Sequence, residues 1–168
     1  GETWTNLGTT GPEGISGSDD ARYISLETAP DADNPLPEVV WISYDGTEYT
    51  VLSSFYDDTS DTWSGPTALP PGTTGTDPYV GTSTFRTDSR LIVAFEDESG
   101  TGDRIKLDVH DGTNWSTVAS TGGLPAGTDD VLDGYFALTG FTDTELYLTY
   151  MTDTPDFEVR RYNGTDWN

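Results

Sequence analysis

The stretch Val109-His110-Asp111-Gly112-Thr113-Asn114-Trp115-Ser116 recurs along the chain, and its recurrence is the main evidence for the fold. Its clearest relative is Arg161-Tyr162-Asn163-Gly164-Thr165-Asp166-Trp167, and looser forms surround Trp63 and Trp4. The tryptophans of these four stretches, Trp4, Trp63, Trp115 and Trp167, are spaced by 59, 52 and 52 residues. A period near 50 residues is typical of repeat architectures in which similar units stack or radiate. The Asp-Gly and Asn-Gly pairs predict hairpin turns before Trp115 and Trp167, because these residues tolerate positive φ.

Each repeat also contains three strand-like runs before its tryptophan strand. The first runs begin at Tyr23, Tyr79 and Tyr135, which are 56 residues apart in both intervals. The second and third runs cover 38–44 and 48–56, then 90–96 and 104–110, then 145–150 and 157–162. The second runs are almost continuously apolar, which predicts strands that are covered on both faces. The third run of the middle repeat alternates, so we expect a half-exposed strand whose polar face carries Arg104, Lys106, Asp108 and His110.

These runs predict an all-β fold in a single domain that spans residues 1–168. The repeats cover approximately 5–63, 64–115 and 116–167, and an outer strand at 1–6 is expected to complete one unit. No segment has a sustained helical period, and Gly, Pro, Asp and Thr cluster between the runs.

A four-stranded repeat of this length that ends in a tryptophan strand resembles the blade of a β-propeller. The elements Asp111-Gly112-Thr113-Asn114-Trp115 and Asn163-Gly164-Thr165-Asp166-Trp167 resemble the Asp-Gly-x-x-Trp motif of fucose-binding lectin propellers. The resemblance implies a β-propeller-like array of three four-stranded blades. Because propellers usually close with four to eight blades, it further implies a partial propeller or half of a six-bladed ring. Self-association or further blades in a longer chain would complete such a ring.

The charge balance restricts the partners and the habitat. The chain has 30 acidic and 7 basic residues, a net charge of −23, and no cysteine. Such a field repels phosphate, so we expect neither nucleic acid nor anionic membranes as partners. The absence of a long apolar run predicts no membrane insertion. This acidity is typical of proteins from high-salt environments, and we predict an extracellular or surface-exposed location there, on a halophile or on a virus that infects one.

Most candidate ligand-binding residues lie on the third strands, whose ends are expected to form one rim of the ring, and one further candidate lies on a second strand. A sugar stacks its apolar face on an aromatic ring while its hydroxyls bond to charged side chains, a chemistry that Arg and Tyr or Trp supply. We therefore nominate Arg104, His110, Arg160, Tyr162 and Trp41. Trp41 departs from the tryptophan period, and Val93 and Leu148 are expected at its place in the other repeats. The alternative is that these side chains only shield the edge or fill the core.

Acidic loops are candidate calcium sites, because a hard cation takes six to eight oxygen ligands from a flexible loop. The first candidate is the insertion that carries Asp31, Asp33 and Asn34, and the loops at 57–61 and 97–103 are similar in composition. In so acidic a chain, solvated loops are the alternative. The sequence indicates no other cofactor.

Three functional hypotheses follow. The first is a non-enzymatic recognition or adhesion module that binds glycans or other cell-surface components. The second is a purely structural repeat of a larger surface or viral-fibre protein. The third, a fragment of a propeller glycosidase, is less favoured because no polar cluster breaks the similarity of the repeats.

Overall fold

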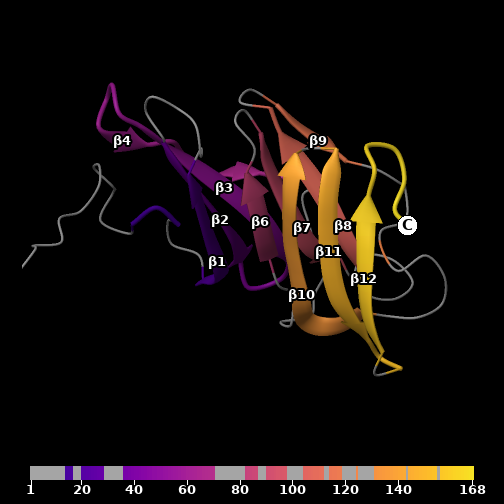
Figure 1. Cartoon of the computed structure of the whole chain (residues 1–168). Coiled ribbons are helices and arrows are strands. Elements are labelled where there is room, and N and C mark those ends of the chain that lie inside the picture. Colours follow the sequence, from indigo (N-terminus) through magenta and orange to yellow (C-terminus); the bar gives the residue numbers. More distant parts are fainter. Residues whose placement is uncertain are drawn as a thin grey trace, which may run out of the picture.

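The computed structural model describes residues 14–16, 20–28, 36–70, 82–86, 90–97, 104–111, 114–118, 124, 131–142, 144–154 and 156–168. Within these ranges every regular element is a β-strand, and the strands form three antiparallel sheets (Figure 1). The prediction of an all-β fold is therefore confirmed. The predicted outer strand at 1–6 lies outside the described residues.

Each sheet is a meander of strands that follow one another in sequence. Sheet 1 contains β1 (Asp20–Thr28), β2 (Pro37–Tyr44), β3 (Tyr49–Asp57) and β4 (Thr62–Trp63), with β5 (Thr67–Ala68) also paired to β3. Sheet 2 contains β6 (Thr82–Arg86), β7 (Leu91–Asp97), β8 (Arg104–His110) and β9 (Trp115–Thr117). Sheet 3 contains β10 (Val131–Thr142), β11 (Glu145–Thr152) and β12 (Phe157–Tyr162), and a single bridge joins Tyr162 to Trp167. The sheets thus have five, four and three strands rather than four each, although the order of strands within each repeat is as predicted.

The hairpin turns use a carboxylate or amide oxygen to hold backbone N–H groups. The Asp45 side chain accepts hydrogen bonds from the N–H groups of Thr47 at 2.8 Å and Glu48 at 3.0 Å. Both hydrogen bonds lower the pKa of the Asp45 carboxyl group, and the bond from Glu48 has the larger effect. The Asn163 side chain accepts equivalent bonds from the two residues before Trp167. Only the glycine has positive φ in both turns, 100° at Gly46 and 93° at Gly164, so these are four-residue Asx turns rather than turns with two left-handed residues.

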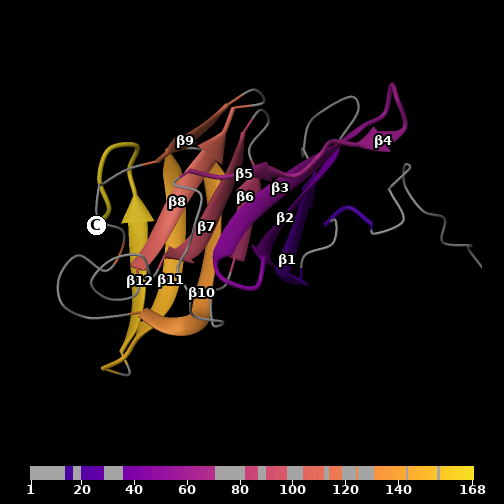
Figure 2. The ribbon, with the colours of Figure 1, turned by 180° about the vertical axis from the view of Figure 1, so that it is seen from behind.

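The three sheets stack face to face in the order of the chain, with sheet 2 between the other two (Figures 1 and 2). One apolar core joins Val40 and Ile42 of sheet 1 to Val93 and Phe95 of sheet 2. A second core joins the opposite face of sheet 2 to sheet 3; its members include Ile92, Ile105, Leu107, Leu146, Leu148 and Tyr150. The first strands lie together, because β6 contacts both β1 and β10.

We name the two faces of each sheet by their direction along the chain. The upstream face points toward the preceding sheet, and the downstream face points toward the following sheet. In β7, for example, Val93 lies on the upstream face and Ile92 on the downstream face. The upstream face of sheet 1 and the downstream face of sheet 3 are the two outer faces of the stack.

Burial of the second strands agrees with the sequence, and burial of β8 agrees except at Asp108. Every residue of β7 is buried, and so are the six central residues of β2. On the polar face of β8, Arg104, Lys106 and His110 are half-buried, as expected. The expectation is wrong for Asp108, which is only 1 % exposed because this face is the upstream face and is turned toward sheet 1.

Candidate functional site

Trp63, Trp115 and Trp167, the periodic tryptophans that the structure describes, belong to a repeated cross-strand pair at one end of each sheet. Tyr56 lies opposite Trp63, His110 opposite Trp115, and Tyr162 opposite Trp167. The ring centroids in the three pairs are 5.7, 4.8 and 5.3 Å apart. Such distances are those of favourable aromatic contacts. The third-strand ends that the sequence nominated as a rim are thus held in place by the tryptophans.

A pocket of about 170 Å³ opens beside the last of these pairs, between sheets 2 and 3. We call it the rim pocket. It is lined by Arg90, Ile92, Val109 and Val118 from sheet 2 and by Thr144, Tyr162 and Gly164 from sheet 3. Its wall therefore combines aliphatic side chains with a guanidinium, a hydroxyl and a phenol.

Local structure explains why the pocket has this shape. Tyr162 is buried in the core between sheets 2 and 3 and packs on Trp167. Gly164 has positive φ, and a Cβ atom there would lie 3.1 Å from the Cβ atom of Thr144. Glycine therefore lets the Asn163–Asp166 turn approach Thr144 closely, so that both contribute to the same wall. The pocket thus depends on the turn chemistry of the repeated motif.

At the corresponding end of sheets 1 and 2, the two sheets make a polar contact. His110 stacks on Trp115, and its Nδ1 atom lies 3.6 Å from Oε1 of the buried Glu38. Arg104 lies six residues away on the same strand, roughly 20 Å at about 3.3 Å per residue. The structure therefore places Arg104 and His110 on one face, as expected, but it does not bring them together.

Asp108 is a buried carboxylate between these two residues. Neither of its side-chain oxygens makes a hydrogen bond of good geometry in the described part of the chain, although the Thr117 hydroxyl is close enough to affect its ionisation. Burial raises the pKa of Asp108 to about 6, against smaller opposing effects from the Thr117 hydroxyl and the Lys106 ammonium. Lys106 itself forms an ion pair with Asp97. The ionised Asp108 carboxylate therefore lowers the free energy of unfolding at neutral pH.

Arg160 and Tyr162 share the upstream face of sheet 3, as expected from strand alternation. Arg160 is engaged by Glu158, with Nη2–Oε2 2.6 Å, and donates from Nε to the Tyr150 hydroxyl at 3.3 Å. The Tyr150 hydroxyl also donates to Glu158 at 2.9 Å. Hydrogen bonds from Tyr150 and then Arg160 lower the pKa of Glu158. Tyr162 lines the rim pocket, whereas Arg160 is not among its lining residues.

Arg90 is a pocket residue that the sequence analysis missed. Arg90 is exposed and directly precedes β7. In the sequence it is only the first residue of an apolar run. The available signal was a single arginine at the start of a strand whose following residues are all buried. A cation in that position is expected at the end of the sheet, because charged side chains are seldom fully buried.

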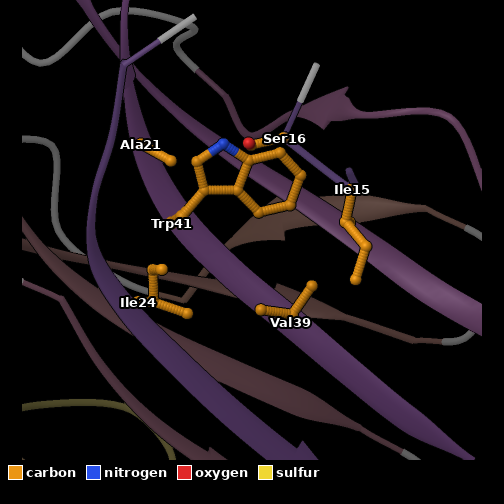
Figure 3. A pocket seen from close by; sticks show the side chains of 6 residues that line it. All are labelled: Ile15, Ser16, Ala21, Ile24, Val39 and Trp41. Atoms are coloured by element: carbon orange, nitrogen blue, oxygen red, sulfur yellow. The ribbon is translucent and has the colours of Figure 1, made fainter. Parts of the chain in front are cut away.

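Trp41 lies on the outer, upstream face of sheet 1 and is 1 % exposed. Figure 3 shows its indole above a hollow of about 200 Å³ that is lined by Ile15, Ser16, Ala21, Ile24, Val39 and Trp41 itself. The indole Nε1 has no hydrogen-bond partner among the described residues. The buried position agrees with the core alternative for this side chain.

Strand register corrects the predicted equivalence of Trp41 with Val93 and Leu148. Trp41 pairs with Leu52, which is four residues before Tyr56. By the same count, Phe95 pairs with Lys106 and Tyr150 pairs with Glu158, four residues before His110 and Tyr162. Trp41, Phe95 and Tyr150 are therefore equivalent buried aromatics of the three upstream faces. Val93 and Leu148 instead correspond to Val39.

The first calcium candidate, Asp31, Asp33 and Asn34, lies outside the described residues, as does most of the loop at 97–103. In the loop at 57–61, Asp57 accepts bonds from the Thr59 N–H at 2.9 Å and the Ser60 hydroxyl at 2.8 Å. The described ranges contain no group of three or more His, Asp or Glu side chains that could hold a metal ion. They also contain no helix that is long and apolar enough to span a membrane.

Comparison with known proteins adds no relative. No protein-family model matches the chain, and a search of curated proteins finds no significant match.

Proposed function

We propose that the chain is a non-enzymatic recognition module that binds a single sugar ring of a surface glycan in the rim pocket. One observation carries the proposal: Arg90, Thr144 and Tyr162 converge on a small pocket whose remaining side chains are aliphatic. Pockets for drug-sized ligands occupy roughly 300–1,000 Å³, so a pocket of about 170 Å³ suits one small ring. A sugar ring offers an apolar face to the aliphatic wall and hydroxyls to the three polar groups.

The proposal includes a partial β-propeller as the scaffold. Three features support it: meander sheets, their face-to-face stacking in chain order, and the neighbouring first strands β1, β6 and β10. In a propeller, consecutive blades stack radially around an axis that their first strands line. The rim pocket would then lie between two blades.

The net charge of −23 narrows the class of glycan. When the Debye length is long, a strongly acidic protein repels sialylated, sulfated and other acidic sugars. A neutral sugar avoids this repulsion at every salt concentration. We therefore expect a neutral sugar, presented at a cell or virus surface in an environment of high salt. Adhesion is the biological role that this combination favours.

The lining of the rim pocket favours binding over the glycosidase alternative. Glycoside hydrolysis ordinarily requires two carboxylates that flank the scissile bond. The lining residues in the described part of the chain supply an arginine, a threonine and a tyrosine as their polar side chains, and none of them is Asp or Glu.

A glycan array in molar NaCl, followed by calorimetric titration of the best-bound neutral sugar, tests the proposal. Arg90→Ala should weaken binding at least tenfold, because it removes the one cationic donor among the described lining residues. Arg161→Ala is the matched control, since Arg161 is exposed on the opposite face of sheet 3 and pairs with Glu145. An array without binding, or equal losses in both variants, would contradict the proposal.

A further inference from the structure

The three sheets stack in the same orientation. Each contact between two sheets therefore joins the downstream face of one sheet to the upstream face of the next. The downstream face of sheet 1 meets the upstream face of sheet 2, and the downstream face of sheet 2 meets the upstream face of sheet 3. The same kind of contact is thus made twice within one chain. In the part of the chain that the structure describes, no further sheet covers the upstream face of sheet 1 or the downstream face of sheet 3.

The downstream face of sheet 3 exposes side chains whose equivalents are buried in sheet 2. Phe157 and Val159 lie five and three residues before Tyr162, as Ile105 and Leu107 lie before His110. Ile105 and Leu107 are 0 % and 4 % exposed because sheet 3 covers them. Phe157 and Val159 are 67 % and 55 % exposed. Sheet 3 therefore presents an apolar face at positions that the repeat otherwise buries.

On the upstream face of sheet 1 the contrast is confined to the edge strand β1, because Val39 and Trp41 of β2 are already buried in the single chain. Leu26 pairs with Val39, and Leu138 pairs with Leu148, the equivalent of Val39 in sheet 3. Leu138 is 7 % exposed in the core between sheets 2 and 3, whereas Leu26 is 59 % exposed. The hollow beside Trp41 lies on this face, is lined mainly by apolar side chains, and is large enough to take an apolar side chain (Figure 3).

We propose that a second copy of the chain docks head to tail on these two faces. The downstream face of sheet 3 of one copy packs on the upstream face of sheet 1 of the other, in continuity with the two contacts inside each chain. The reverse contact is identical, and it closes a ring of six sheets. Contacts between different faces are heterologous and form a ring when the rotation per unit closes. In this chain the first strands lie together, with β6 in contact with both β1 and β10, as strands around the axis of such a ring would.

High salt is a condition for this association. Each copy carries a charge of −23, so two copies repel each other strongly when the Debye length is long. In 1 M salt the Debye length is about 3 Å, and the repulsion between separated carboxylates is screened. The burial of exposed apolar side chains on both faces then drives association.

Sedimentation velocity in molar NaCl tests the proposal with single substitutions on each face. The wild-type chain has a mass of 18.2 kDa, and the mass obtained from sedimentation should be twice that value. Leu26→Asp and Val159→Asp should each sediment at the monomer mass, because either one places a charge in both contacts of the ring. Both positions are exposed in the single chain, so unchanged circular dichroism should show that the variants remain folded.

Thr165→Asp, an equal change of charge at an exposed turn residue, is the control and should stay at twice the chain mass. A wild-type chain that is monomeric at all concentrations would overturn the proposal. Dissociation by only one of the two face variants would also overturn it, since it would indicate a symmetric contact of one face with itself. Masses that grow without limit would exclude the closed ring.

Discussion

Tyr162 lies directly opposite Trp167 across the last hairpin, with ring centroids 5.3 Å apart, and it belongs both to the core between sheets 2 and 3 and to the wall of the rim pocket. The same pairing recurs as Tyr56 with Trp63 and as His110 with Trp115. The Tyr162 side chain therefore belongs both to the repeated aromatic pair and to the wall of the candidate binding pocket. Substitutions at this position must separate the two roles.

Tyr162→Ala should lower the free energy of unfolding by about 3–5 kcal/mol, the usual cost of deleting a buried aromatic ring. Tyr162→Phe keeps the ring on Trp167 and should cost much less. Urea denaturation of both variants in molar salt measures the difference. Equal stability of the two variants would show that the ring does not support the core, and would contradict the observed packing.

Asp108→Asn should stabilise the protein at neutral pH. The folded-state pKa of Asp108 is raised from 3.8 to about 6 by burial, so the folded chain holds a proton at a pH where the unfolded chain has lost it. This group therefore makes stability fall as pH rises from about 4 to 6, and a shift of this size corresponds to about 3 kcal/mol above that window. The stability difference between Asp108→Asn and wild type should be largest at pH 7.5 and shrink toward pH 4.

Thermal denaturation at both pH values in molar salt measures that difference. Asp153→Asn removes the same charge from an exposed position and corrects for the lower overall repulsion. If both variants changed stability equally at each pH, the buried carboxylate would have no special role.

Gly140→Ala should destabilise sheet 3 by about 1–3 kcal/mol, the typical cost of overpacking. A Cβ atom at Gly140 would lie 2.7 Å from the Glu145 carbonyl oxygen and 2.9 Å from Cδ2 of Leu146. Gly65→Ala is the control, because a Cβ atom there would have no neighbour within 4 Å. Similar unfolding midpoints for the two variants would contradict the close pairing of β10 with β11.

Salt should control the stability of the whole fold. The Debye length grows from about 3 Å at 1 M to about 30 Å at 0.01 M, so separated carboxylates begin to repel one another in dilute buffer. With a net charge of −23, the melting temperature should fall on dialysis and recover when molar NaCl is restored. A melting temperature that is the same in both conditions would show that the acidity is incidental to stability.

The repeat unit could be predicted from the sequence because it depends on local signals. The Asp-Gly turns and strand alternation are properties of neighbouring residues, and the tryptophan period shows where the same local pattern recurs. Together they predicted the strand order of all three sheets. The equivalence of Trp41 with Phe95 and Tyr150 could not be predicted in this way. The turns between the second and third strands differ in length, so only the pairing register aligns these positions.

The candidate site was predicted only in part, because its composition depends on how the sheets stack. Tyr162 was nominated from its strand, and it lines the rim pocket. Arg90 and Thr144 belong to different sheets, and nothing in the local sequence indicates that they meet. The burial of Asp108 has the same origin, since alternation shows that a face is polar but not that another sheet covers it.

The most direct test of the rim pocket is a map of backbone amide chemical shifts during titration with the neutral sugar that binds best, in molar NaCl. We predict that the largest changes cluster at Arg90, Val118, Thr144 and Gly164, on both sides of the contact between sheets 2 and 3. Largest changes around Trp41, or around Phe157 and Val159 on the outer face of sheet 3, would contradict this account.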